Sequence, residues 1–319
     1  LFRSSIQGSR IQFRAFTRAM IQNDSNNIYT RILSVYNKEG ALNITDKKNI
    51  YSRHPSSVDA QIDTLMTRGM IIGDYAFAKD FLEEVYFHRF LSYSVPFFVT
   101  GNTHQYKEGS KFGDVVKIYE FDSKLRLLIL SAIEKIEISV RTQFINLSWK
   151  YGPHFYLDYK LFRDHKLLND SIERIQYQLK VSNDLLVSEY YHRYQDPEMP
   201  PVWIAIELTT IGQLSKWLRN LKHEEDKENV SHRYELHFSL LQSILDNLTL
   251  IRNFSAHHTR IWNRLFDFEC ALNDTPHNSL VHALCEESRI YSVLLLIIHV
   301  LKSLGFDQEF FYDLSRLIE

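Results

Sequence analysis

The residues from Arg252 to Arg264 concentrate side chains that can act on a phosphodiester. This segment reads Arg-Asn-Phe-Ser-Ala-His-His-Thr-Arg-Ile-Trp-Asn-Arg, and no acidic residue occurs between Asp246 and Asp267. An imidazole titrates near neutral pH and can serve as a general acid or base, whereas a guanidinium binds a phosphate through two parallel hydrogen bonds. We therefore expect a locally positive site in a chain whose formal net charge is only -2.

The spacing within this segment has geometric consequences. On a continuous helix, Asn253 and His257 lie one turn apart on the same face, and Arg260 and Arg264 extend that face. Arg252 and His257 are separated by roughly 140° around such a helix. A joint site would need a long reach by Arg252, a distorted turn or a second subunit. Because the Arg-x4-6-His pattern is short enough to occur by chance, its weight depends on the residues around it.

The overall composition excludes several classes of protein. A nearly neutral chain does not coat polyanions generally, so any contact with nucleic acid should come from a local basic patch. Cys270 and Cys285 are too few and too isolated for a disulfide framework or a four-ligand zinc site, and we expect neither a metal nor a cofactor. The longest apolar run, residues 290–301, is shorter than the roughly 20 residues that span a bilayer. It predicts a buried helix, and we expect a cytoplasmic protein that makes no membrane contact.

The hydrophobic pattern predicts an all-α protein. The chain is 45% hydrophobic, and its 10 Gly and 7 Pro leave long uninterrupted segments. We expect an N-terminal helical extension and linker over residues 1–55 and one helical domain over residues 56–319. The predicted helices span Ser57–Met70, Asp74 to about Ser92, Asp122 or Ser123 (as N-cap) to Gly152, residues 164–195, Trp203–Leu221, an apolar stripe from Leu241 to Ile251, about Asn278–Leu304, and Asp307 to the end. We expect an exposed loop at 101–114, an exposed connector at His223–Asn229 and no strand.

Two charged patterns leave alternatives open. Arg10, Arg14 and Arg18 recur on one helical face, which is compatible with a solvated face, an RNA-contacting arm or a targeting peptide. Glu137 and Arg141 have the favourable i,i+4 orientation for an ion pair. This pair is either a solvated surface pair or a support that orients the helix of the site.

The residues around the Arg252 segment resemble a known family. The motifs that match, in chain order, are Gln61-Ile62 through Arg68-Gly69-Met70 with Asp74, Phe87–Tyr93 followed by Pro96-Phe97, Tyr119–Asp122 with Leu125-Arg126, Ile133–Glu137 through Arg141, Trp203, Glu207, Gly212–Ser215, and the Arg252–Arg264 run itself. Together they resemble the Abi-like family, the AbiD and AbiF type of bacterial phage-defence proteins, whose catalytic core is counted among the HEPN ribonucleases. The resemblance extends over about residues 57–265.

This resemblance implies a fold and an activity. It implies a HEPN-type helical bundle with additional helices, acting as a toxin-like, metal-independent endoribonuclease in abortive infection. Catalysis would rest on Arg252, His257 and Asn253, and RNA binding on His258, Arg260 and Arg264, with Glu137 and Arg141 in support. HEPN nucleases generally pair two copies of the motif, so a homodimer is expected. The alternative is a non-catalytic RNA-binding module that holds a partner RNA or a regulatory antitoxin RNA.

Overall fold

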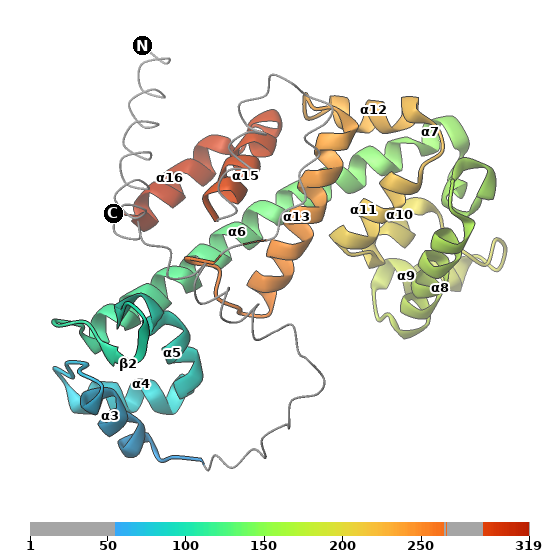
Figure 1. Cartoon of the computed structure of the whole chain (residues 1–319). Helices are drawn as coiled ribbons and strands as arrows, with labels where there is room; N and C mark the ends of the chain where they lie inside the picture. The colour runs from blue at the N-terminus through green and yellow to red at the C-terminus, as the bar shows by residue number, and fades with distance from the viewer. Residues whose placement is uncertain (1–54, 265, 267–289, 319) are drawn as a thin grey trace, which may run out of the picture. The chain divides into compact units, whose positions relative to one another are not determined.

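The computed structural model describes residues 55–264, 266 and 290–318 of the chain (Figure 1). The predicted N-terminal helix therefore lies outside the described residues, as does the first part of the helix predicted from Asn278. The described residues are mostly helical, with one short two-stranded sheet. This confirms the all-α class, and the specifically HEPN-type arrangement stays a prediction.

The chain divides into two compact units, Leu1–Glu120 and Phe121–Glu319. The long helix α6 (Phe112–Asn146) begins in the first unit and continues into the second. The predicted boundary between residues 1–55 and 56–319 falls at the edge of the described chain and stays a prediction.

The first unit is a small helical cluster with an aromatic core. Its elements before α6 are α3 (Val58–Thr67), α4 (Tyr75–Glu84), α5 (Phe87–Ser94), η1 (Val95–Phe97), β1 (Phe98–Val99) and β2 (Asn102–Tyr106). Helices begin after Ser57 and after Asp74, as predicted, and each of these side chains accepts a hydrogen bond from a backbone N–H of the first turn. The predicted single helix from Asp74 to Ser92 is wrong, because Val85 and Tyr86 are extended and separate α4 from α5. The break lets Phe81 and Phe90, from the two helices, contact the same Phe112 ring.

Strands occur where none was predicted. β1 and β2 pair antiparallel, and the rings of Phe98 and Tyr106 stack with their centroids 4.5 Å apart. The expected exposed loop at 101–114 is therefore partly strand and partly the first turn of α6. Strands of two and five residues are too short to show the alternation that reveals a strand in sequence.

The second unit contains the remaining helices. They are α7 (Ser148–Tyr151), η2 (Phe155–Leu157), η3 (Tyr159–Leu161), α8 (His165–Val181), α9 (Leu185–Arg193), α10 (Val202–Ala205), η4 (Ile206–Leu208), α11 (Ile211–Asn220), α12 (Glu224–His232), α13 (Phe238–Ala256), α15 (Ile290–Leu304) and α16 (Asp307–Ile318). α13 packs against α11, α12 and α15, and α15 packs against α16 (Figure 1). α6 is bound to this assembly by hydrogen bonds from Lys135 to Glu309 in α16 and between Ser139 and Tyr234.

The start of α6 differs from the prediction. The helix begins at Phe112, so Asp122 is not an N-cap but a fully buried residue well inside the helix. Packing of Val115 and Val116 into the core of the first unit extends the helix beyond the stripe seen in sequence. The predicted apolar stripe is confirmed for six of its seven residues, since Leu125, Ile129, Ala132, Ile136, Val140 and Leu147 are buried. The seventh, Leu128, is half-buried.

The predicted helix Trp203–Leu221 is also interrupted. The chain turns at Thr209, whose backbone is extended, and α11 starts anew with Thr210 as N-cap. Thr210 and Gln213 form a reciprocal capping box, which satisfies backbone donors at this helix start. The break leaves the Thr209 carbonyl available as a hydrogen-bond acceptor for Arg141 of α6.

The predicted exposed connector His223–Asn229 is largely helix α12, with two of its charged residues buried. Asp226 accepts hydrogen bonds from Lys150 Nζ at 2.9 Å and from the Tyr151 hydroxyl at 2.7 Å. These partners compensate the cost of burying a carboxylate, which a count of charges in sequence does not reveal.

Among the described helices, none is both long enough and apolar enough to cross a membrane.

The close approach of α11 to α13 gives a test of the packing. A Cβ added to Gly212 would lie 2.9 Å from Cγ2 of Thr249, whose hydroxyl donates to the Leu245 carbonyl and so holds the side chain in place. We expect Gly212→Ala to lower the free energy of unfolding, measured with urea, by about 1–3 kcal/mol through overpacking. Adding Thr249→Ser, which removes the methyl group, should restore most of the loss. A Gly212→Ala protein as stable as the wild type would contradict the observed contact.

Candidate functional site

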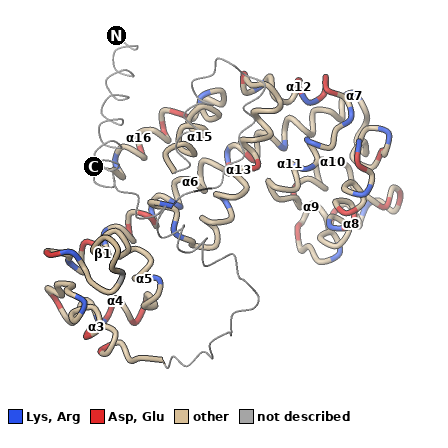
Figure 2. The backbone as a smooth tube through the Cα atoms, in the orientation of Figure 1, with Lys and Arg blue, Asp and Glu red and all other residues tan. Residues whose placement is uncertain are grey.

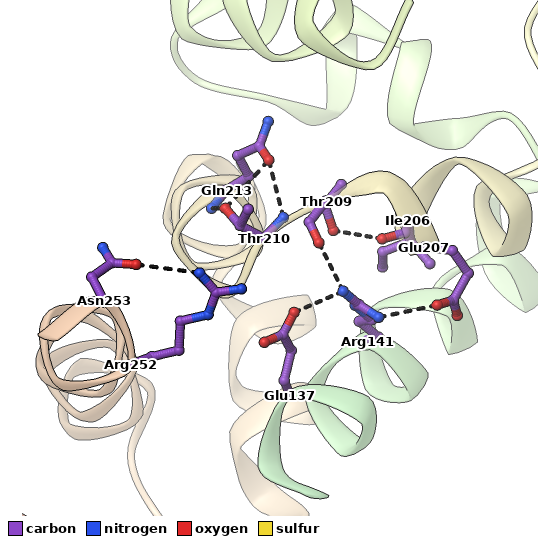
Figure 3. A network of polar contacts seen from close by, with 9 residues as sticks. All are labelled: Glu137, Arg141, Ile206, Glu207, Thr209, Thr210, Gln213, Arg252 and Asn253. Atoms are coloured by element: carbon purple, nitrogen blue, oxygen red, sulfur yellow. Dashed lines mark hydrogen bonds and ion pairs between the residues drawn. The ribbon is translucent and has the colours of Figure 1, made fainter. Parts of the chain in front are cut away.

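The candidate site lies at the C-terminal end of α13. The helix buries Leu241, Leu245 and Leu248 on its apolar face, as the stripe predicted. Arg252 follows Ile251, the last residue of that stripe, and is half-buried, whereas Asn253 is exposed. The side chain of Arg252 points toward the first turn of α11 (Figure 3), and its Nη1 lies 3.4 Å from Asn253 Oδ1.

The helix ends sooner than the sequence predicted. Its last residue is Ala256, and His257 is the C-cap, with its N–H bonded to the carbonyls of Asn253 and Ser255. His258 has a φ of 57°, in the left-handed region, and the N–H of Thr259 bonds to the Phe254 carbonyl at 2.8 Å. This is a Schellman ending with histidine at the position that usually holds glycine.

This ending corrects the predicted stripe. Asn253 and His257 still lie one turn apart, but Arg260 and Arg264 come after the reversal at His258 and do not extend a face of α13. The left-handed conformation costs a non-glycine residue about 1–2 kcal/mol, so sequence propensity alone does not point to it. Such conformations cluster at functional sites, where the surrounding structure maintains them.

Arg141 of α6 is the centre of a polar network beside α13 (Figure 3). Its Nη2 donates to Glu137 Oε1 at 2.7 Å and to the Thr209 carbonyl at 2.7 Å, and its Nη1 donates to Glu207 Oε2 at 3.0 Å. The side chains of Glu137 and Arg141 are only 15% and 16% exposed. They therefore form the predicted ion pair, but it is not a solvated surface pair.

The charge of Arg252 also acts on this network, through the carboxyl of Glu137. Burial raises the pKa of the Glu137 carboxyl, and the nearby guanidinium groups of Arg141 and Arg252 counteract part of that rise. Glu137 thus lies between an arginine that it binds directly and another close enough to influence its charge. The sequence predicts Arg252 as a catalytic residue and Glu137 and Arg141 as its support, and these three side chains lie near one another (Figure 3). Glu207 and Thr209 complete the network and had no predicted site role, although Glu207 is one of the residues on which the resemblance to the Abi-like family rests.

The groups after the helix end are arranged differently. His257 and His258 are exposed, and Arg260 and Arg264 are half-buried. The guanidinium of Arg264 lies 4.0 Å from the centroid of the Phe254 ring, and burial together with Arg260 lowers the pKa of Arg264. Within the described residues, no hydrogen bond joins Arg252 to His257. The single chain therefore presents the arginine and the histidine near the same helix end without direct contact.

Asp122 is the residue of this region that sequence analysis missed. Its Oδ1 accepts hydrogen bonds from the backbone N–H groups of Ile261 and Trp262. The available signal was a charged i,i+4 pair, Asp122 and Arg126, inside an otherwise apolar stripe. The sequence pattern predicts Asp122 or Ser123 as a helix cap instead.

A surface cavity of about 720 Å³ begins beside the network. Thr210 and Gln213 of α11 line one side, and residues of α8 such as Arg174 and Tyr177 line the other. Thr249, one turn before Arg252, contacts the same first turn of α11 at Gly212. Among the residues that the structure describes, no group of three or more His, Cys, Asp or Glu side chains is placed to hold a metal ion.

The sequence matches the protein family described as Abi-like protein over residues 80–263. The chain belongs to the Abi-like family. The matched range covers more than half of the chain and includes α13, the network of Arg141 and the segment up to Asn263. The family name refers to abortive infection, a form of phage defence. No curated protein and no solved structure matches this Abi-like chain.

The raised pKa of Glu137 in the Abi-like chain predicts a pH dependence of stability. The folded carboxyl holds its proton more tightly than the unfolded chain, whose carboxyl has a pKa of about 4.3. The contribution of Glu137 to the free energy of unfolding should therefore fall as the pH rises from about 4.3 through the folded value.

Glu137→Gln removes this titration while keeping the shape of the side chain. The free energy of unfolding of the wild type, relative to that of Glu137→Gln, should decrease between about pH 4 and pH 7 in chemical denaturation. A difference that stays constant or increases over this range would contradict the environment described for Glu137.

Proposed function

We propose that this Abi-like chain is a metal-independent endoribonuclease of the HEPN type that acts in phage defence. The observation that carries the proposal is the arrangement at the end of α13. Arg252 is half-buried beside Glu137 and Asn253, while His257 is exposed at the end of the same helix. A cation near the phosphate and an accessible proton carrier both favour phosphodiester cleavage by an internal hydroxyl.

The proposed reaction uses the ribose 2′-hydroxyl as the nucleophile. As the bond from O2′ to phosphorus forms, the bond from phosphorus to O5′ breaks, leaving a 2′,3′-cyclic phosphate and a 5′-hydroxyl. A base removes the 2′ proton, and an acid protonates the leaving 5′ oxygen. The exposed imidazole of His257 can perform either proton transfer. Arg252 stabilises the charge that grows on the phosphate oxygens, with Asn253 beside it.

RNA binding is assigned to the residues after the helix end. His258, Arg260 and Arg264 lie on the segment that leaves α13, and no acidic residue interrupts it. A local group of cations suits the phosphates of a single strand, whereas the chain as a whole has a formal charge of -2. Figure 2 shows both basic and acidic residues spread along the described backbone. This concentration of charge favours binding through one patch over general polyanion binding.

The central test is cleavage of total RNA by purified protein with EDTA present. We expect Arg252→Ala and His257→Ala each to lower the cleavage rate by about 10²–10⁴-fold, the range for loss of acid–base or charge stabilisation. Arg252→Lys keeps the charge but not the two-pronged geometry and should recover only part of the activity. The new 5′ ends should accept phosphate from polynucleotide kinase directly, and a 2′-deoxy linkage at the cut should block the reaction.

A different result would favour the alternative function. If the wild type binds RNA but leaves it intact, and Arg252→Ala only weakens binding, the chain is an RNA-binding module. If RNA affinity is absent at moderate salt, both proposals fail.

The proposal includes a two-fold homodimer. Each chain supplies one Arg252 and one His257, and the two do not bond to each other within the described residues. A dimer with its α13 helix ends facing across the axis would supply two imidazoles, one as base and one as acid. We expect the cleavage rate per chain to follow the dimer fraction measured by sedimentation as protein is diluted. Full activity in a strict monomer would contradict the dimeric site.

A further inference from the structure

Asp122 holds a segment far from it in sequence. Its side chain is fully buried, and it forms an ion pair with Arg126, whose side chain is 4% exposed. Oδ1 of Asp122 accepts hydrogen bonds from the backbone N–H of Ile261 at 3.2 Å and of Trp262 at 2.6 Å. One carboxylate of α6 is therefore bound to the chain directly after the end of α13.

The contact with Asp122 holds a part of the backbone that lies beyond the end of α13. The helix has ended at Ala256, and the left-handed residue His258 has turned the chain. Arg260 lies two residues beyond His258 and immediately before Ile261, whose side chain is fully buried. The apolar contacts of Ile261 resist exposure to water but have little directional preference. Hydrogen bonds from two successive N–H groups to one buried oxygen are directional, and they fix the orientation of this turn.

Burying the Asp122 carboxylate costs desolvation free energy, which an apolar residue at this position would not require. A buried ion pair is often no more stabilising than apolar residues of similar volume, so stability alone does not explain this pair. What the pair adds is a defined position for the backbone at Ile261 and Trp262. Asp122 and Arg126 lie within residues 80–263, which match the Abi-like family, and the proposed reaction assigns them no role.

We propose that Asp122 is a positioning residue for the site. It holds the turn at Ile261 and Trp262, and thereby keeps His257, His258 and Arg260 in a constant arrangement relative to Arg252. The inference rests on the proposed function, because the arrangement that it maintains is that of the proposed catalytic and RNA-binding groups.

Two variants of the pair separate position from charge. Asp122→Ala removes the acceptor, and we expect the cleavage rate to fall by roughly ten- to a hundredfold, as for other small misplacements of catalytic groups. The double variant Asp122→Asn with Arg126→Gln keeps an oxygen for the two N–H groups and leaves no unpaired buried charge. It should retain cleavage within about threefold of the wild type. A double variant as inactive as Asp122→Ala would overturn the positioning role.

Asp226 provides a matched control in the same unit. Its side chain is also buried and accepts hydrogen bonds from Lys150 and Tyr151, but these partners are not in the segment 252–264. Asp226→Ala should lower thermal stability as Asp122→Ala does, yet keep the cleavage rate per folded molecule. If the two alanine variants lose the same activity at equal loss of stability, Asp122 has a general structural role and the inference fails.

Hydrogen exchange tests the contact without RNA. In the wild type, the amides of Ile261 and Trp262 should be protected, and in Asp122→Ala they should exchange at least tenfold faster while amides in the middle of α13 keep their rates. Unchanged exchange at Ile261 and Trp262 overturns the inference. A wild type that cleaves no RNA refutes the proposed function separately, and the exchange measurement then decides alone whether Asp122 positions this turn.

Discussion

Helix α6 carries two ion pairs, Asp122–Arg126 and Glu137–Arg141, into the interior of the second unit. Burying a charge without partners costs several kcal/mol, so each pair needs further hydrogen bonds to be tolerated. Asp122 obtains them from the turn after α13, and Arg141 obtains one from the Thr209 carbonyl before α11. Because these partners are distant in sequence, satisfying the charges of one helix determines where two other segments lie.

The last turn of α13 and the reversal that follows it carry the proposed site. Arg252 is close to Glu137, and the chain beyond His257 is bound to Asp122. A guanidinium partly withdrawn from water interacts more strongly with an incoming phosphate than a fully solvated one does, because the local dielectric is lower. His257, the proton carrier of the proposed reaction, is exposed. Arg252 is thus half-buried and His257 exposed at the end of the same helix.

Local sequence patterns predicted much of this structure and failed at identifiable points. The apolar stripes of α6 and α13 and the helix start after Asp74 were correct, because periodicity and capping act over a few neighbouring residues. The end of α13 was missed, since histidine rarely takes the left-handed conformation that His258 adopts. The break before α11 was also missed, although Thr210 and Gln213 have the spacing of a capping box, a local signal that was present.

The sequence by itself determined the helical class and the family, and it selected Arg252, Glu137 and Arg141 as candidate site residues, because residue type, periodicity and i,i+4 spacing are local properties. Only the tertiary structure decided that Arg252 lies close to Glu137, that Arg260 and Arg264 leave the helix face, and that Asp122 binds the turn at Ile261. These outcomes depend on which buried charges find partners, and the partners come from segments more than sixty residues away. The sequence does not show whether a charged side chain will be solvated or buried. The geometry of the candidate site depends on that outcome, because the buried Asp122 and the half-buried Arg141 bind backbone groups of distant segments.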